Sequence, residues 1–554
     1  MLKLVLGASG SGKTTLLYAR IRARAEAGKR SILLVPEQFT SSTEARIYRE
    51  LGDALSGMVE SYSFTSLAEH ILAIEGGAAV QTLTDAGRAV LVRRALEELQ
   101  DNVHYYYRHR RSAAFCQMAA ETIDELKSAG LSGQQLQELA RDCGTESAKL
   151  GELALIFQGY ESLLAGTGMD PADRLELAAD RLEAALARDE LPDFLREREV
   201  FIDEFDTFNA PKKRLMGAML AALPAVTVAL CEDGTPMQPG DLELFSGAKQ
   251  VAAQLRQLAR KNGAQVAAPE LLRRDLRHKD APGLAALTEL LETGSCTPPE
   301  SAPELRLFAA ASREEEARCA AAAIRRLMRQ GVRCGKIAVV CRDISLYRAA
   351  VRYEFRMAEI PLYCDEPTTP EFSAPATAVR ALLALLRGAD MTEQLTVLAK
   401  TGLCDLTEPE VCALENYAYT WSPNAAAWRA EFTKSPRGFG DAELTEEDTQ
   451  NLTRAENARK KLVTAVDTLR SKVRGANAEQ ISRALYFCLK ELGAEEQQAA
   501  QVEDIRTARG IPAAEEAARE RGDAAAGRDG AAAGQSGHHC AGVRGSFQSA
   551  AAFL

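Results

Sequence analysis

The stretch that decides the fold lies at the start of the chain and reads Leu2-Lys3-Leu4-Val5-Leu6-Gly7-Ala8-Ser9-Gly10-Ser11-Gly12-Lys13-Thr14. An apolar run precedes the pattern G-x-x-x-x-G-K-T, and residues 15–27 follow with helical periodicity. In such a loop the glycines let backbone N–H groups curl around phosphates, and the lysine reaches the β and γ oxygens. The Thr14 hydroxyl is placed to hold Mg²⁺. The pattern predicts that ATP and Mg²⁺ bind at Gly7, Ala8, Ser9, Gly10, Ser11, Gly12, Lys13 and Thr14.

Length, charge and cysteine content limit the class of protein. A chain of 554 residues predicts about three or four domains. The net charge of −11 argues against a protein that coats polyanions, so nucleic-acid contacts must come from local basic patches. The 12 cysteines include no C-x-x-C pair and are typical of reduced, buried thiols. With no apolar run of membrane-spanning length and no signal peptide before the first strand, we expect a cytoplasmic protein with no membrane contact.

Short apolar runs alternate with helical patterns, which indicates an α/β fold with parallel sheets. In the first part of the chain, strands are expected at residues 3–6, 31–35, 58–61, 199–202 and 226–230. Residues 84–187 are almost purely helical in pattern and are predicted to be an insert in a first domain of residues 1–280. After a linker at 294–303, strands are expected at 305–309 and 336–340 with helices at 314–330 and 344–358. A helical pattern resumes at 374–492.

The second chemical motif is Val200-Phe201-Ile202-Asp203-Glu204-Phe205, an apolar strand that ends in two acids. In a phosphate-loop ATPase we expect this strand to lie beside the first one, so that Asp203 binds the Mg²⁺ water shell. Glu204 is then the candidate catalytic base. Alone, such a pair is more often a solvated strand end. The phosphate loop favours the catalytic interpretation.

Several segments together resemble one family of DNA-processing proteins. Their order is that of the UvrD-like superfamily 1 helicase motifs, with V-P-E-Q in the second motif and no adenine-binding Gln motif upstream. Together with the helical Leu414-Glu415-Asn416-Tyr417, they resemble AddB, the B subunit of the AddAB helicase/nuclease, over residues 1–507. Besides the phosphate loop and the acidic motif, the segments are Leu33-Leu34-Val35-Pro36-Glu37-Gln38, Ser61-Tyr62-Ser63-Phe64-Thr65-Ser66-Leu67 and Ile337-Ala338-Val339-Val340-Cys341-Arg342-Asp343.

This resemblance implies two RecA-like domains, the second within residues 300–507. It also implies an AddA-like partner that carries the motor, DNA ends and single-stranded DNA as ligands, and a role in double-strand break repair by homologous recombination. Family members read the Chi sequence and carry a C-terminal 5′ to 3′ exonuclease domain with a 4Fe-4S cluster. The cluster cysteines and nuclease acids are not in this chain, which has about half the family's usual length. We therefore expect the isolated chain neither to cut nor to unwind DNA.

Departures from active helicases argue against independent translocation, whereas the intact phosphate loop favours ATP binding. No Gln follows the acidic motif, and Leu230-Cys231-Glu232-Asp233 replaces the G-D-x-x-Q segment that couples ATP to DNA. An independent ATP-driven translocase would need those glutamines. A phosphate-loop kinase for a small molecule, with the helical insert as a lid, is the other alternative. It would leave the second α/β unit unexplained.

Arg342 is a candidate catalytic residue. The resemblance implies that an arginine here reaches the γ-phosphate across the interdomain cleft, where its planar fork neutralises transition-state charge. The alternative is a surface arginine at a strand end.

The helical insert contains Tyr105-Tyr106-Tyr107-Arg108-His109-Arg110-Arg111. Tyr105 and Tyr107 could stack on bases, while three arginines, Arg108, Arg110 and Arg111, could bind phosphates. The alternative is a helix junction whose tyrosines pack inward and whose arginines are solvated.

Residues 508–554 are rich in Ala and Gly and lose the apolar periodicity, so we expect a disordered tail. Either the tail is natural or it results from a reading-frame shift in a GC-rich gene, and composition favours the shift. His538, His539 and Cys540 are accordingly not interpreted as metal ligands, because no fourth ligand accompanies them.

Overall fold

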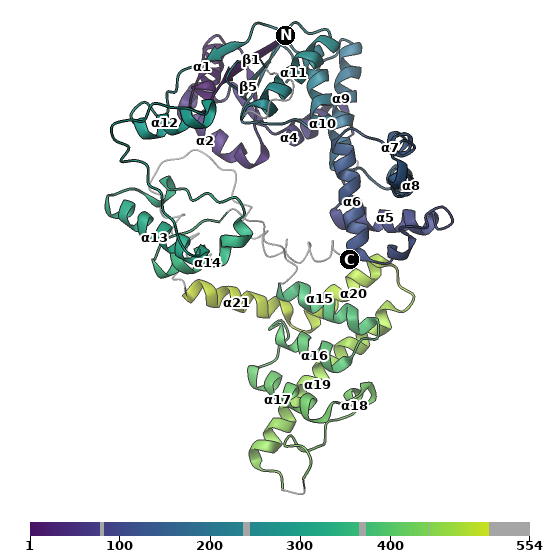
Figure 1. Ribbon diagram of the computed structural model, residues 1–554. Coiled ribbons are helices and arrows are strands. Elements are labelled where there is room, and N and C mark those ends of the chain that lie inside the picture. The colour runs from purple at the N-terminus through teal and green to yellow at the C-terminus, as the bar shows by residue number, and fades with distance from the viewer. Residues whose placement is uncertain (78–81, 237–243, 365–372, 441–442, 509–554) are drawn as a thin grey trace, which may run out of the picture. The chain divides into compact units, whose positions relative to one another are not determined.

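The computed structural model describes residues 1–77, 82–236, 244–364, 373–440 and 443–508 (Figure 1). The chain divides into two compact units, Met1–Cys319 and Ala320–Leu554. Within the described ranges, no helix has the length and apolar character needed to cross a bilayer. The predicted tail, with His538, His539 and Cys540, lies outside these ranges.

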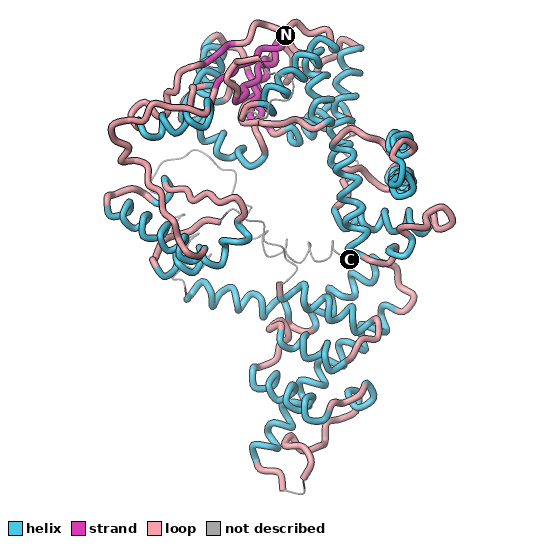
Figure 2. Tube along the Cα trace, viewed as in Figure 1, coloured by secondary structure: helices cyan, strands magenta, loops and turns pink. Residues whose placement is uncertain are grey.

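The first unit is built on one six-stranded sheet, which Figure 2 shows in magenta. The strand order is β3-β2-β4-β5-β1-β6, and every pairing is parallel. β1, β2, β4 and β5 are buried almost throughout, as expected for a parallel sheet covered by helices on both faces. The predicted α/β fold and the five predicted strands of this unit are confirmed. The strands are β1 (Leu2–Gly7), β2 (Ser31–Leu34), β3 (Val59–Tyr62), β4 (Glu199–Ile202), β5 (Ala225–Cys231) and β6 (Glu270–Leu272).

Alternate residues of the strands enter two separate cores. Val5 and Phe201 pack with residues of α1 (Lys13–Glu26) and α2 (Thr40–Leu51). Leu4 and Ile202 point to the other core, which holds residues of α4 (Phe64–Glu75), α10 (Ala210–Ala222) and α11 (Ser246–Lys261). The sheet therefore separates α1 and α2 from α4, α10 and α11. The short α3 (Asp53–Ser56) and α12 (Pro282–Thr293) complete this part of the unit.

The helices between β3 and β4 include the predicted insert. A separate apolar core joins residues of α5, α6, α7 and α8, whereas α9 contributes Leu175, Ala178 and Leu182 to the core beside the sheet. Lys127 of α6 is buried and binds Asp170 at 2.8 Å, just before α9. The helices are α5 (Asp85–Glu98), α6 (Ala113–Ser128), α7 (Gly133–Ala140), α8 (Ser147–Leu164) and α9 (Pro171–Ala187).

The second unit is helical in its described residues. Its main core surrounds the fully buried Trp428, whose indole N–H donates to Thr392 Oγ1 at 2.9 Å. α13 (Arg313–Arg329) crosses the boundary between the units. The remaining helices are α14 (Ile344–Met357), α15 (Ala374–Leu386), α16 (Met391–Lys400), α17 (Glu408–Trp421), α18 (Ala425–Arg429), α19 (Glu446–Val473), α20 (Ala478–Glu491) and α21 (Ala494–Ala508).

The strand predictions at 305–309 and 336–340 are wrong for the structure as described. Residues 305–309 form no strand, Cys334–Lys336 forms a 3₁₀ turn, and residues 337–340 are extended without strand pairing. Leu307 is 98% exposed and Val340 is 90% exposed. A strand is stabilised by the ladder that a neighbour supplies, and the described residues supply none to either segment.

Candidate nucleotide-binding site

The phosphate loop connects the carboxyl end of β1 to the first turn of α1. Gly10 and Gly12 have φ angles of 82° and 91°, in the left-handed region that side chains disfavour. Gly12 is the residue before the first turn of α1, so the loop ends where the helix presents its unpaired N–H groups. These two glycines explain why the motif forms a compact turn.

Two side chains of the loop lie where a phosphate group would be bound. The Lys13 ammonium donates to the carbonyl oxygens of Gly7 and Ala8 at 2.7 and 2.8 Å. Burial lowers the pKa of Lys13, and the nearby Cys231 and Asp203 oppose that shift. Ser11 is buried, and its hydroxyl has no hydrogen-bond partner among the described residues. A buried hydroxyl without a partner is costly, so the loop leaves a polar group that a phosphate oxygen could satisfy.

Asp203 directly follows β4 and lies close to the phosphate loop. The expectation that β4 lies beside β1 is wrong, because β5 pairs with both strands and separates them. α1 nevertheless packs across this part of the sheet, against β1, β5 and β2. The first turn of α1 thereby brings Thr14 within hydrogen-bonding reach of the Asp203 carboxylate.

The two acids differ in burial. Asp203 is 5% exposed, and burial raises its pKa, against the hydrogen bonds from Thr14 and from the Glu204 backbone. Its Oδ1 accepts that backbone N–H at 3.0 Å. Glu204 is exposed and has a φ of 65°. Partial desolvation of its carboxyl raises the pKa of Glu204, and the charge of Asp203 raises it further. The pair thus combines a buried carboxylate with an exposed carboxyl on a strained turn.

A segment that the sequence patterns did not indicate contacts the loop from β6, the strand that pairs with β1. Directly after β6, the Leu276 N–H donates to the Gly10 carbonyl at 3.0 Å, and Arg277 donates to Ser9 Oγ at 3.2 Å. Asp275 holds this turn by accepting the Arg277 and His278 N–H groups at 3.0 and 3.1 Å. Arg277 also lowers the pKa of Lys13. The available signal was the basic run Arg273-Arg274 and Arg277 after a short apolar stretch.

Arg46 of α2 is a second missed residue. Its guanidinium lies 4.8 Å from the centre of the Tyr18 ring, and its positive charge acts on both Asp203 and Glu204. Burial raises the pKa of Tyr18 to about 12, so this tyrosine stays neutral at physiological pH. No pattern around Arg46 in the sequence indicates this position.

The residues present fit a nucleotide with Mg²⁺. The unpartnered Ser11 hydroxyl, the left-handed glycines and Lys13 suit phosphate oxygens. Within the described part of the chain, no group of three or more His, Cys, Asp or Glu could hold a metal by itself. Mg²⁺ commonly takes one or two protein ligands and completes its shell with waters and phosphate oxygens, which Asp203 and Thr14 would allow.

The Tyr105–Arg111 segment has features both of a helix junction and of an exposed surface that could contact DNA. The Glu152 carboxylate accepts the backbone N–H groups of His104, Tyr105 and Tyr106 at 2.8 to 3.1 Å. Tyr106 stacks on Phe115 and the Arg110 guanidinium lies 3.8 Å from the Tyr107 ring centre, as at a helix junction. Tyr105 is 53% exposed, and Arg108 and Arg111 are also exposed. The DNA contact remains a prediction.

Arg342 lies in the second unit, is exposed, and precedes Asp343, which caps α14 through Ser345 N–H at 2.9 Å. Its role at the γ-phosphate remains a prediction. The cysteines in the described residues are free thiols, but only Cys116, Cys404 and Cys488 are buried, so the expectation of mostly buried thiols is wrong.

The fold and the site define a class of protein. A parallel sheet, a phosphate loop on its first strand and a buried aspartate after β4 are the parts of a phosphate-loop nucleotide-binding domain. Phe64 of the Ser61–Leu67 segment packs against Phe205 of the acidic motif, with ring centres 5.2 Å apart. The class is therefore a RecA-like, helicase-type α/β domain that carries a phosphate-loop motif.

Comparison with known proteins identifies the family. The family model described as "ADDB, N-terminal" matches residues 4–288, more than half of the chain. The chain belongs to the AddB family.

Curated relatives, each named as the B subunit of an ATP-dependent helicase/deoxyribonuclease, support this assignment. The protein of Moorella thermoacetica is 31% identical over 93% of this chain and 46% of its own length. That of Desulforudis audaxviator is 32% identical over 77% of this chain and 37% of its own. That of Symbiobacterium thermophilum is 30% identical over 78% and 38%. The chain therefore spans less than half the length of these relatives.

Proposed function

We propose that this chain is the ATP-binding part of a subunit of a heterodimeric ATP-dependent DNA helicase/exonuclease that acts on DNA ends. The proposal depends on one observation in this member of the AddB family: the complete phosphate loop lies beside the buried Asp203, with Thr14 within hydrogen-bonding reach of its carboxylate. The proposed place of action is the cytoplasm, in double-strand break repair by homologous recombination.

The residues of the loop have distinct tasks in this proposal. The N–H groups of Gly10 to Thr14 bind phosphate oxygens, and the Lys13 ammonium exchanges its two carbonyl partners for them. Thr14 and Asp203 hold Mg²⁺, which supplies charge neutralisation at the phosphates when bound. Glu204 orients the attacking water, and Arg277 adds a second cation at the loop.

The partner and the DNA ligand follow from the family. Relatives are named as one subunit of a helicase/deoxyribonuclease, which supports an AddA-like partner for this chain. We propose that the complete complex reads Chi and degrades 5′ to 3′, with the nuclease and its 4Fe-4S cluster in the region that this chain does not span. The chain contributes nucleotide binding and contacts to single-stranded DNA through Tyr105, Tyr107, Arg108, Arg110 and Arg111. Co-purification with an AddA-like protein tests the heterodimer.

The nucleotide proposal is tested by calorimetry with Mg²⁺ and ATP. Lys13→Ala removes the main phosphate cation and should weaken ATP binding by about tenfold to a hundredfold, the effect of losing a charge-assisted hydrogen bond. Lys29→Ala is the matched control, because Lys29 is an exposed lysine beyond the end of α1. Equal ATP affinity of the two variants would contradict the assignment.

A further inference from the structure

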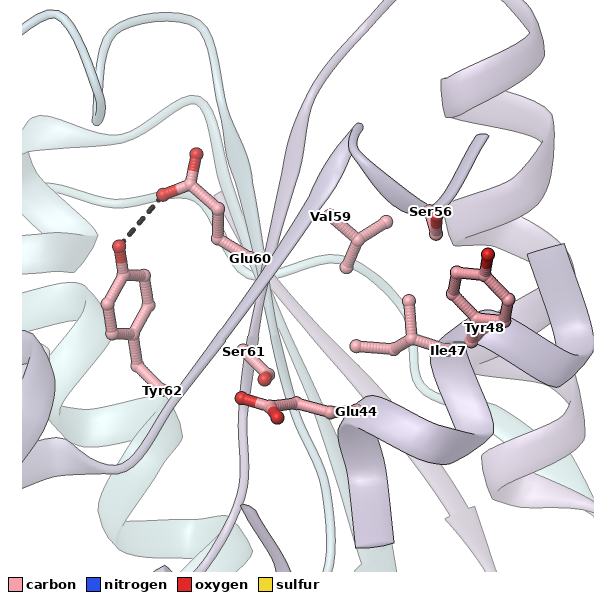
Figure 3. Close-up of a pocket in the computed structure, with 8 residues that line it drawn as sticks. All are labelled: Glu44, Ile47, Tyr48, Ser56, Val59, Glu60, Ser61 and Tyr62. Carbon is pink, nitrogen blue, oxygen red and sulfur yellow. Dashed lines mark hydrogen bonds between the residues drawn. The ribbon is translucent and has the colours of Figure 1, made fainter. Parts of the chain in front are cut away.

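An open groove runs beside β3, the terminal strand of the sheet. It has a volume of about 350 Å³ and lies between the strand and the helices that precede it. Figure 3 shows Ile47 and Val59 facing one another across it, with Glu44 and Ser61 side by side and Tyr48 near Ser56. The groove is lined by Glu44, Ile47, Tyr48, Ser56, Val59, Glu60, Ser61 and Tyr62. We name these residues the β3 edge groove.

Backbone polar groups of β3 face this groove. Met58 and Tyr62 accept the Ser31 and Val35 N–H groups at 3.0 Å each, so the even-numbered residues of the strand bond to β2. In a parallel ladder the alternate residues turn their N–H and C=O groups to the other side. Val59 and Ser61 therefore present theirs to the groove, and within the described residues no other strand pairs with them. Val59 is 8% exposed, so these groups are partly shielded from water.

The side chains of the groove are apolar at its centre and acidic at its rim. Ile47 and Val59 are both buried. Glu60 is already neutralised, because it accepts hydrogen bonds from Arg198 at 2.7 Å and from Tyr62 at 2.8 Å. Glu44 is exposed and forms no ion pair within the part of the chain that the structure describes. Glu44 thus leaves one acidic position next to an apolar floor.

We propose that the β3 edge groove binds an extended segment of a partner protein, which adds to the sheet as a seventh strand beside β3. Strand addition would satisfy the N–H and C=O groups of Val59 and Ser61. A small apolar side chain would lie over Ile47 and Val59, and a lysine or arginine would lie beside Glu44. Because the site is on the outer strand, it is separate from the phosphate loop, and the inference does not depend on ATP binding.

The charge of the rim argues for a different protein rather than a second copy. Pairing two β3 edges would bring the Glu44 carboxylates of both copies, unpaired among the described residues, to one interface, and like charges across an interface are unfavourable. A basic partner segment has the complementary charge. The length of β3, four residues, matches a short extended peptide.

The test uses the whole chain and the probe acetyl-Lys-Val-Lys-Val-Lys-Val-amide labelled with a fluorophore. Anisotropy should show binding, and N-methylation of the residues that face β3 should weaken it at least about tenfold, because the ladder bonds are lost. The acidic counterpart, with Glu in place of Lys, should bind at least about tenfold more weakly. Undetectable binding of the basic probe at about 1 mM would overturn the proposal.

Glu44→Lys should weaken binding of the basic probe about tenfold and improve that of the acidic probe. Glu26→Lys is the matched control, since Glu26 is an exposed acid at the end of α1, and it should change binding less than about twofold. Ser61→Pro, which deletes one outward N–H, should also weaken binding while thermal unfolding confirms a folded chain. Equal effects of Glu44→Lys and Glu26→Lys, or binding that survives N-methylation, would overturn the proposal of strand addition. A dimer of the chain that Ser61→Pro abolishes would assign the groove to a second copy and overturn it as well.

Discussion

β1 and residues 337–340 are similar in sequence and different in structure. Both are short apolar runs followed, after a turn, by a helix, and the second ends at the helicase-like Cys341-Arg342-Asp343. β1 lies between two parallel neighbours, and Leu4, Val5 and Leu6 are at most 2% exposed. Val340 is 90% exposed, with no neighbouring strand in the described residues. An apolar run therefore has the potential to form a strand, but only partners on both sides turn it into a buried one.

The largest expected effect tests this difference in packing. Phe201→Ala removes a fully buried ring from β4 and should destabilise the first unit by about 3–5 kcal/mol, through lost transfer energy and a cavity. Val340→Ala should change stability by less than about 0.5 kcal/mol, as for exposed positions. Urea unfolding followed by far-ultraviolet circular dichroism measures both, because Trp421 and Trp428, the two tryptophans of the chain, lie in the second unit and do not report on β4. A large cost for Val340→Ala would mean that this segment is packed in solution, and the comparison would fail.

The next effect separates the two arginines assigned to the nucleotide. Arg277→Ala should weaken ATP binding about tenfold, because Arg277 lies on the phosphate loop next to Ser9. Arg342→Ala should leave the affinity for ADP unchanged and reduce any ATP hydrolysis, since its predicted task is at the γ-phosphate. Arg274→Ala is the control for the charge near the loop. Weaker ADP binding by Arg342→Ala, together with unchanged nucleotide binding by Arg277→Ala, would reverse the assignment.

A smaller effect concerns the DNA contact in the insert. The triple change of Arg108, Arg110 and Arg111 to Ala should weaken single-strand binding and reduce the salt slope by at most about 2, at about 0.7 for each phosphate contact. Because Arg110 already stacks on Tyr107, most of the change should come from the other two. Arg93 and Arg94, exposed on α5 and paired with Glu97 and Glu98, provide the control pair. Unchanged binding would assign the segment a structural role.

The smallest effect is a pH dependence at Asp203. Burial raises the pKa of Asp203 in the folded state. The stability that its protonated carboxyl contributes is therefore fully present at a pH below the ordinary aspartate pKa, and it is lost as the pH rises through the raised pKa. Asp203→Asn should therefore raise the midpoint of thermal unfolding of the nucleotide-free chain at pH 7. The gain should shrink toward pH 4. A gain that grows as the pH falls would contradict the raised pKa.

The candidate site was predictable where its residues are contiguous. Gly7 to Thr14 form one loop, and their spacing alone indicates the backbone conformation, which φ angles of 82° at Gly10 and 91° at Gly12 bear out. Arg277 and Arg46 were not predictable, because they come from the segment after β6 and from α2 and approach the site only in the folded sheet. The position of β5 between β1 and β4 also escaped prediction, since strand order is not encoded in any local pattern.

The sequence by itself determined the phosphate loop, the strands of the first sheet and the acid pair at the end of β4, because each depends on residues that are neighbours in the chain. The tertiary structure alone decided which strands find partners, which cations reach the loop and which edge of the sheet stays open. Residues 337–340 have the composition of a strand and lack its ladder, and β3 has a ladder on one side only. Hydrogen bonding between strands joins segments far apart in sequence, so local periodicity can propose a strand but cannot supply its neighbours.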